Sequence, residues 1–315
     1  MTPDEISITN LPLAGIGLAI LAAALLAIGN ELQSRGVAKV QARSGADAAL
    51  GARQFTRLLR NRIWLLGSVA FALSIIVQLA SLSLAPLIVV QPVGVTALVF
   101  AALLTAILTR HRPSRRVARA ILVSIVGVGV FVTVAAIVAE QHPIVETQLV
   151  AILIVLAVVL LLLAGVFVLS RVRDRPVHPM VYVLAGGLLT GFVATLGKTV
   201  ILRVQTVLST EFHFDAATVL TLFCVLGILV AGGLSVYFVQ VAHASNNPEL
   251  VVAGLTVIDP VVAVALGITI LGEAAGAPIW AVIAFVLAGA VAVGGVFLLS
   301  AAQNKDAVEA SAEAH

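Results

Sequence analysis

Long runs of apolar residues, separated by short polar segments, make up most of this chain. A helix needs about 20 residues to cross the roughly 30 Å hydrocarbon core of a bilayer. Runs of that length occur at residues 11–32, 62–83, 86–108, 117–139, 147–169, 179–204, 217–241, 249–271 and 278–300. Because lipid offers no hydrogen bonds to the backbone, each run is predicted to be a helix. The pattern therefore predicts an all-α, multi-pass membrane protein with about nine transmembrane helices.

Composition strengthens this prediction and excludes several classes of protein. The chain is 61% hydrophobic and only 10% charged, whereas soluble domains carry roughly 25% charged residues. The single cysteine excludes a disulfide framework. We therefore expect a multi-pass protein of the plasma membrane, with the lipid bilayer as its surroundings.

The basic residues predict how the chain is oriented. Of its 18 Lys and Arg residues, 15 lie in the connections 34–62, 109–119 and 170–179. These connections share one side if the helices alternate, and the positive-inside rule makes that side cytoplasmic. Residues 1–10 are then extracytoplasmic and the tail 301–315, expected to be disordered, is cytoplasmic. The basic charge thus reflects topology, so no nucleic-acid partner is expected.

The basic connection 34–62 has a further feature. It mixes leucine and phenylalanine with arginine in the stretch ALGARQFTRLLRNR. This pattern is typical of a helix that lies in the membrane interface. We therefore expect an interfacial arm after the first transmembrane helix.

Two similar stretches suggest an internal repeat. VVQPVGV, around Pro92, resembles VIDPVVA, around Pro260. The two stretches lie five spans apart, and an odd offset inverts the second copy in the membrane. We predict an inverted-repeat bundle, with four helices in residues 11–139 and five in 147–300, an arrangement common in secondary transporters.

The two prolines are predicted to break their helices. Proline suits the first position of a helix, and aspartate is a favoured cap before it, so Asp259 would cap a new half-helix. Asp259 also lies about 14 Å beyond Leu250 at 1.5 Å per residue, near the membrane midplane, where a carboxylate is costly. Two interpretations stay open: a residue that couples transport to a proton or cation, or a cap alone. For Gln91, a structural kink and a ligand contact both stay open.

Three other polar residues are candidates for the site. Lys198 is expected near the outer face, either reaching the interface or meeting an anionic substrate group. Glu31, in GNELQ, is expected to close the first helix at the cytoplasmic edge, as a gate or as a solvated helix end. Gln78 would line a cavity or form an interhelical hydrogen bond. Glu273 is expected to be interfacial.

Three stretches carry a resemblance to a known family: LASLSLAPLIVVQPVGVTALVF, GLLTGFVATLGKTV, and IDPVVAVALGITILGE with its glutamate thirteen residues after the proline. They resemble the drug/metabolite transporter superfamily, in particular its EamA-like and NIPA-like branch of the type seen in actinobacteria. The resemblance implies a secondary transporter, and the NIPA-like branch implies Mg²⁺ as cargo. The family also has a lysine at the place of Lys198. Thr105 stands where the first repeat of EamA-like proteins would have a glutamate.

Three functions follow as hypotheses. The first is a secondary carrier of a small solute that works by alternating access, with Asp259 coupling transport to a proton or cation. The others are a NIPA-like Mg²⁺ transporter and a non-transporting membrane scaffold. The sequence has no ATP-binding, HExxH or GxSxG motif, so neither an enzyme nor a cofactor is expected. The substrate, the coupling ion, the direction of transport, the ligands of any metal ion and the formation of a homodimer stay open.

Overall fold

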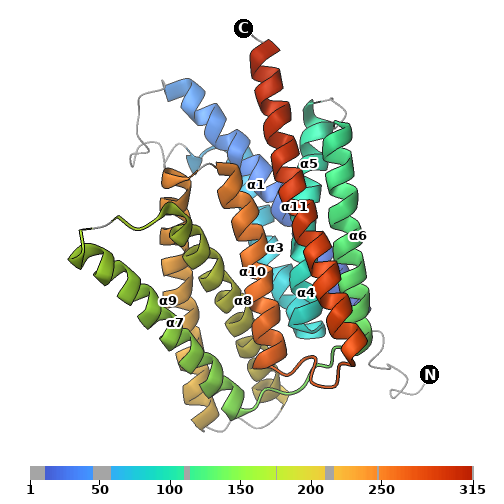
Figure 1. The fold of residues 1–315 in the computed structure, drawn as a ribbon, viewed down its shortest axis with the longest axis vertical. Coiled ribbons are helices and arrows are strands. Elements are labelled where there is room, and N and C mark those ends of the chain that lie inside the picture. Colours follow the sequence, from blue (N-terminus) through green and yellow to red (C-terminus); the bar gives the residue numbers. More distant parts are fainter. Residues whose placement is uncertain are drawn as a thin grey trace. The chain divides into compact units, whose positions relative to one another are not determined.

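All regular structure in the described part of the chain is helical. The computed structural model describes residues 11–44, 58–109, 114–174, 176–209, 216–246 and 248–313. Its helices are α1 (Leu11–Ser44), α3 (Arg62–Leu84), α4 (Leu87–Gly94), α5 (Thr96–Thr109), α6 (Arg115–Val138), α7 (Glu146–Val172), α8 (Pro179–Ser209), α9 (Ala216–Ser245), α10 (Pro248–Thr269) and α11 (Ile279–Glu313) (Figure 1). Nine helical segments in these ranges are long and apolar enough to cross a membrane, α4 and α5 together supplying one. The predicted spans are confirmed.

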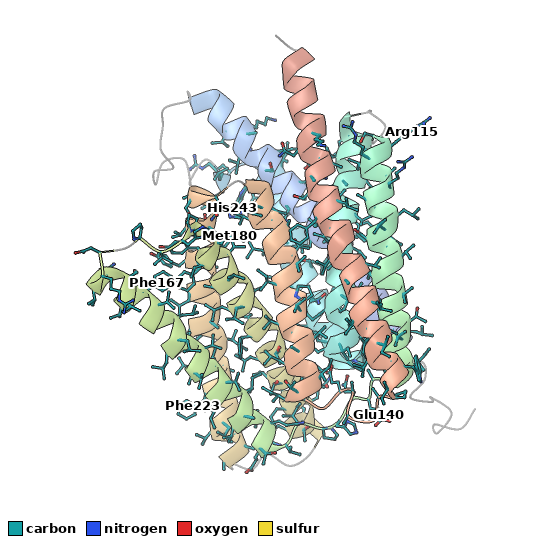
Figure 2. All side chains as sticks on the ribbon, in the orientation of Figure 1. Arg115, Glu140, Phe167, Met180, Phe223 and His243 are labelled. Atoms are coloured by element: carbon teal, nitrogen blue, oxygen red, sulfur yellow. The ribbon has the colours of Figure 1, made fainter. Side chains whose placement is uncertain are left out.

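Apolar side chains project outward along the helices (Figure 2). On α7, for example, Leu161 and Leu162 are 72% and 65% exposed. Leucines this exposed are unfavourable in water and ordinary in lipid, where no hydrophobic penalty applies. The outward faces therefore support the prediction of a membrane protein.

The chain divides into two compact units, and the first contains α1, α3 and α5. Glycines let α1 and α3 approach closely: a Cβ at Gly29 would lie 2.9 Å from the Phe71 nitrogen, and one at Gly36 would lie 2.6 Å from the Trp64 Cβ. The Ser81 hydroxyl also donates a hydrogen bond to the Gly15 carbonyl at 2.7 Å. Small residues and interhelical hydrogen bonds hold this pair together, as is usual in membranes.

The second unit comprises residues 85–92 and 114–315. Within it α6 packs against α11, and α8 packs against both α9 and α10. The α6–α11 contact is very close, because a Cβ at Gly127 would lie 2.4 Å from the Ala292 nitrogen and one at Gly295 would lie 2.5 Å from the Ser124 hydroxyl. Helices α6 and α11 are the last helices of the two copies of the predicted repeat. The inverted repeat itself, like the orientation in the membrane, stays a prediction.

The third span is interrupted, but not at Pro92. Helix α4 continues through Pro92 to Gly94, and a turn at Val95 separates it from α5. Proline removes one hydrogen bond, and the nearby glycine lowers helix stability further, so the helix ends just after both. The chain also passes from the second unit to the first between Pro92 and Val93.

The predicted break at Asp259–Pro260 is absent. Helix α10 runs without interruption from Pro248 to Thr269, so Asp259 does not cap a half-helix. Pro260 leaves only the carbonyl of Thr256 without its usual donor. A true break would instead expose up to four N–H and four C=O groups, which is costly in lipid. The continuous helix is therefore the better solution.

Two helices extend far beyond their predicted ends. Helix α1 extends to Ser44 instead of ending near residue 32, so Glu31 does not close the helix. Helix α11 extends to Glu313, so most of the tail 301–315 is helical and not disordered. Alanine and glutamate, frequent in that tail, are strong helix formers. Residues 45–57 of the basic connection, which include most of the stretch ALGARQFTRLLRNR, lie outside the described residues.

The α6–α11 contact gives a direct test of the packing. We expect Gly127→Ala to lower the melting temperature of the purified protein, because overpacking costs about 1–3 kcal/mol. Gly129→Ala is the matched control, since a Cβ there meets nothing within 4 Å, and alanine is the better helix former by about 0.5–1 kcal/mol. Equal melting temperatures for the two variants would contradict the described packing.

Candidate functional site

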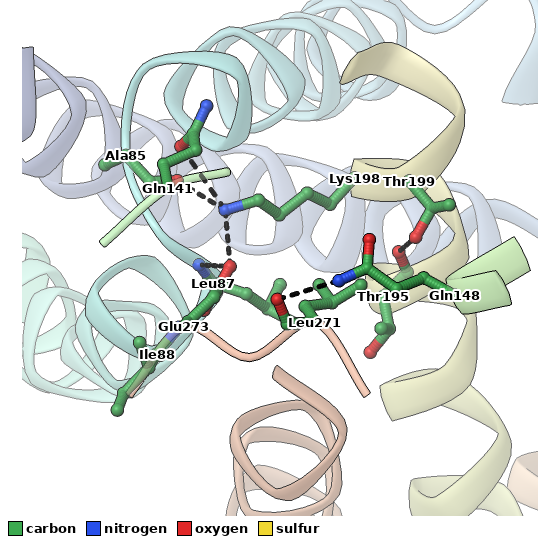
Figure 3. A network of polar contacts seen from close by, with 10 residues as sticks. All are labelled: Ala85, Leu87, Ile88, Gln141, Gln148, Thr195, Lys198, Thr199, Leu271 and Glu273. Carbon is green, nitrogen blue, oxygen red and sulfur yellow. Dashed lines mark hydrogen bonds and ion pairs between the residues drawn. The ribbon is translucent and has the colours of Figure 1, made fainter. Parts of the chain in front are cut away.

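A buried ion pair lies in the second unit, between α8 and the segment that follows α10 (Figure 3). The Lys198 Nζ lies 2.7 Å from Oε1 of Glu273, and the two side chains are 1% and 3% exposed. Breaking a buried pair on one side costs about 3–5 kcal/mol, because it strands the other charge. The burial of each charge is therefore stable only while the other charge is present.

The carboxylate of Glu273 also caps helix α4. The N–H of Leu87 donates to Oε1 at 2.8 Å, and the N–H of Ile88 donates to Oε2 at 2.8 Å. The residues before α4 are Ala85 and Pro86, which have no side chain that accepts a hydrogen bond. A carboxylate is well suited to the role, because helix N-termini carry unpaired N–H groups and partial positive charge.

The backbone holds Glu273 in this position. Gly272 has a φ of +70°, in the left-handed region that favours glycine. The Glu273 N–H donates to the Gly267 carbonyl at 3.1 Å, and its own carbonyl accepts from the Glu140 N–H at 2.9 Å. The Gln148 amide donates to the Leu271 carbonyl at 3.1 Å. The segment after α10 is therefore tied both to α7 and to the connection before it.

Lys198 has two further acceptors. Its ammonium donates to the Ala85 carbonyl at 2.9 Å and to the Gln141 side-chain oxygen at 3.5 Å. Together with Glu273, these oxygens match the three donors of a lysine ammonium. The group is thus balanced in both charge and hydrogen bonds.

Asp259 lies in a different environment, halfway along the apolar span Leu250–Thr269. Its Oδ1 atom is buried and has no hydrogen-bond partner among the described residues. Helix α8 packs closely against this part of α10 through two glycines. A Cβ at Gly187 would lie 2.7 Å from the Ile258 Cβ, and one at Gly191 would lie 3.0 Å from the Asp259 carbonyl oxygen. The structure thus places a carboxylate with an unpaired oxygen in mid-span.

The remaining predicted residues are distributed over both units. Gln91 is buried in α4 and belongs to the same unit as Asp259 and Lys198. Gln78, which is half-buried, and Glu31 belong to the other unit. Glu31 forms an ion pair with Arg35 at 2.6 Å, one turn further along α1.

The structure bears on two expectations at the ion pair. The Lys198 side chain is buried, which does not fit the interpretation that it reaches the membrane interface, and Glu273, expected to be interfacial, has a buried side chain. Each charge finds its partner inside the protein, which removes the reason to reach for water. Glu273 is not among the site residues that the sequence predicts. The available signal was its position thirteen residues after Pro260, which formed part of the family resemblance.

The described residues contain no group of three or more His, Cys, Asp or Glu side chains that could hold a metal ion. A fully dehydrated ion enclosed by protein carboxylates therefore does not fit the described part of the chain. A metal ion bound by the described residues would instead have as oxygen ligands one carboxylate, backbone carbonyls and side-chain amides.

A helical membrane protein with ionisable side chains inside apolar spans has the character of a transporter. Comparison with known families agrees: the model of the family described as "Magnesium transporter NIPA" matches residues 11–305. The chain therefore belongs to this family and is a membrane transporter, which confirms the resemblance to the NIPA-like branch. No significant match was found among curated proteins or among solved structures.

The ion pair can be tested through stability. We expect Glu273→Gln to lower the free energy of unfolding by about 3–5 kcal/mol, because it strands the buried Lys198 ammonium. Unfolding would be followed by titrating detergent-solubilised protein with sodium dodecyl sulfate. Glu146→Gln, which neutralises an exposed carboxylate in the first turn of α7, should change little. Similar unfolding curves for both variants would show that the pair contributes no stability.

Proposed function

We propose that this chain carries Mg²⁺ across the plasma membrane, and that Asp259 lies on the path of the ion. The proposal combines membership of the family with one structural observation. Asp259 has a buried carboxylate oxygen that forms no hydrogen bond with the described residues, halfway along an apolar span. An unpaired carboxylate at this depth is unfavourable, so its presence calls for a ligand that compensates it.

The surroundings of Asp259 suit a hydrated Mg²⁺ ion. Mg²⁺ keeps several of its waters and is usually bound by one or two carboxylates. Among the described residues, Asp259 does not belong to a group of three or more His, Cys, Asp or Glu side chains. Pro260 has no N–H to donate to the Thr256 carbonyl, so this oxygen keeps capacity for a water of the hydration shell. Lys198 is an unsuitable ligand because it repels a cation, and we assign it to holding α4 in place.

Alternating access would require the two units to move relative to each other. The chain crosses between them at residues 84–85, 92–93 and 113–114. The second crossing lies close to the turn at Val95, where the third span is already interrupted. A turn inside a span can absorb the change in backbone angles that such movement needs. Gln91 lies next to this crossing, and we propose it as a polar residue that contacts the path. Glu31 and Gln78, which belong to the first unit, stay candidate site residues on the basis of the sequence.

A carrier of a small organic solute is the alternative. The carboxylate of Asp259 is compatible with such a carrier, because one carboxylate can bind and release one proton. A membrane scaffold, by contrast, has no use for an unpaired carboxylate in mid-span. An enzymatic activity is not part of this proposal, because the family is one of transporters.

The test is Mg²⁺ uptake into proteoliposomes that contain a Mg²⁺-sensitive dye, with a pH-sensitive dye in parallel vesicles. We expect uptake with the wild type and a loss of about tenfold or more with Asp259→Asn, because interactions with a charged group contribute about 1.5–3 kcal/mol. Asp174→Asn, which changes an exposed carboxylate after α7, is the control and should behave as wild type.

Each outcome decides a different part of the proposal. Absence of Mg²⁺ uptake with the wild type would overturn Mg²⁺ as the cargo. Equal uptake with wild type and Asp259→Asn would remove Asp259 from the path. Acidification that accompanies uptake of an organic solute, and that is lost in Asp259→Asn, would favour the alternative carrier.

A further inference from the structure

The ammonium of Lys198 lies among three oxygen atoms that come from three separate segments (Figure 3). These are Oε1 of Glu273 at 2.7 Å, the Ala85 carbonyl at 2.9 Å and the Gln141 side-chain oxygen at 3.5 Å. All three belong to the second unit. We call this group the oxygen cage.

The oxygen cage has the chemistry of a cation site. Carboxylate, backbone carbonyl and side-chain amide oxygens are the ligands that proteins use for hard cations. The cage holds one carboxylate, so a single positive charge balances it. The ammonium nitrogen lies 2.7, 2.9 and 3.5 Å from the three oxygens, farther than the roughly 2.0–2.1 Å at which Mg²⁺ binds its ligands. The cage therefore fits a monovalent cation better than the proposed cargo.

We propose that Glu273, Ala85 and Gln141 form a site for a monovalent cation, and that the Lys198 ammonium is its tethered occupant. The protein then keeps Glu273 charged, and α4 capped, without binding Na⁺ or K⁺ at this place. Because the occupant is covalently attached, the wild-type site does not exchange its cation with solution. This inference does not depend on the identity of the cargo.

The substitution Lys198→Met should convert the cage into an open site. Methionine ends about one atom short of the lysine nitrogen, so it vacates the position of the ammonium. Glu273 stays in place because Leu87 and Ile88 still donate to it, and its uncompensated charge attracts a replacement cation. Gln141 belongs to the exposed connection between α6 and α7, which leaves a route for an ion from the aqueous side.

The experiment measures melting temperature and needs no transport assay. Wild type, Lys198→Met, Lys198→Ala and the double variant Lys198→Met/Glu273→Gln would be purified in choline chloride. Choline would then be replaced stepwise by NaCl or KCl at constant ionic strength. We expect a saturating rise in melting temperature for at least one single variant, because an ion that binds only the folded state stabilises it. Wild type and the double variant should not respond.

Three results would overturn the proposal. The first is the absence of a Na⁺ or K⁺ response in both single variants, which would mean that water or a proton compensates Glu273. The second is an equal response in all four proteins, which would indicate a general salt effect. The third is failure to recover either single variant even in NaCl or KCl, since a bound cation would have restored the charge balance. Recovery only in NaCl or KCl would support the proposal. Failure of Mg²⁺ uptake would not affect any of these results.

Discussion

The carboxylate of Glu273 is shared between two groups that cannot be left unpaired in an apolar interior. One is the N-terminus of α4, which follows a segment without a capping side chain, and the other is the Lys198 ammonium. The donor at Leu87 lies 186 residues before the acceptor in the chain. The ion pair thus connects the start of the third span, α8 and the segment after α10. The packing of this end of the second unit depends on it.

Glu273 and Asp259, two acids of the second unit, differ in whether the described residues compensate their carboxylates. Glu273 has a lysine and two N–H groups, so its charge is compensated by the protein. Asp259 has a buried oxygen that no described residue compensates. A protein tolerates an uncompensated charge inside a membrane where the charge serves a ligand or an ion. This contrast supports the proposal that Glu273 has an architectural role and that Asp259 takes part in transport.

Prolines show why the local sequence was a poor guide to helix breaks. Asp259–Pro260 has the favoured sequence of a capped helix start, yet α10 passes through it. In water, ending a helix there would cost little because the solvent would pair the freed groups. In lipid the same break leaves several backbone groups without partners, so losing the single bond at Pro260 is cheaper. The interruption of the third span occurs at Val95 instead, just before α5 begins in the first unit.

Amino-acid order alone determined the membrane setting, the helical class and the nine spans, because each depends on the length and polarity of continuous segments. It also singled out Asp259 and Lys198, since charge within an apolar run is visible without a fold. Tertiary structure decided which of these charges is paired. Lys198 lies on α8 and Glu273 lies in the segment after α10. Only packing brings the ammonium of one within 2.7 Å of the carboxylate of the other. The partner of a buried charge is a property of three-dimensional proximity, and no local pattern of residues encodes it.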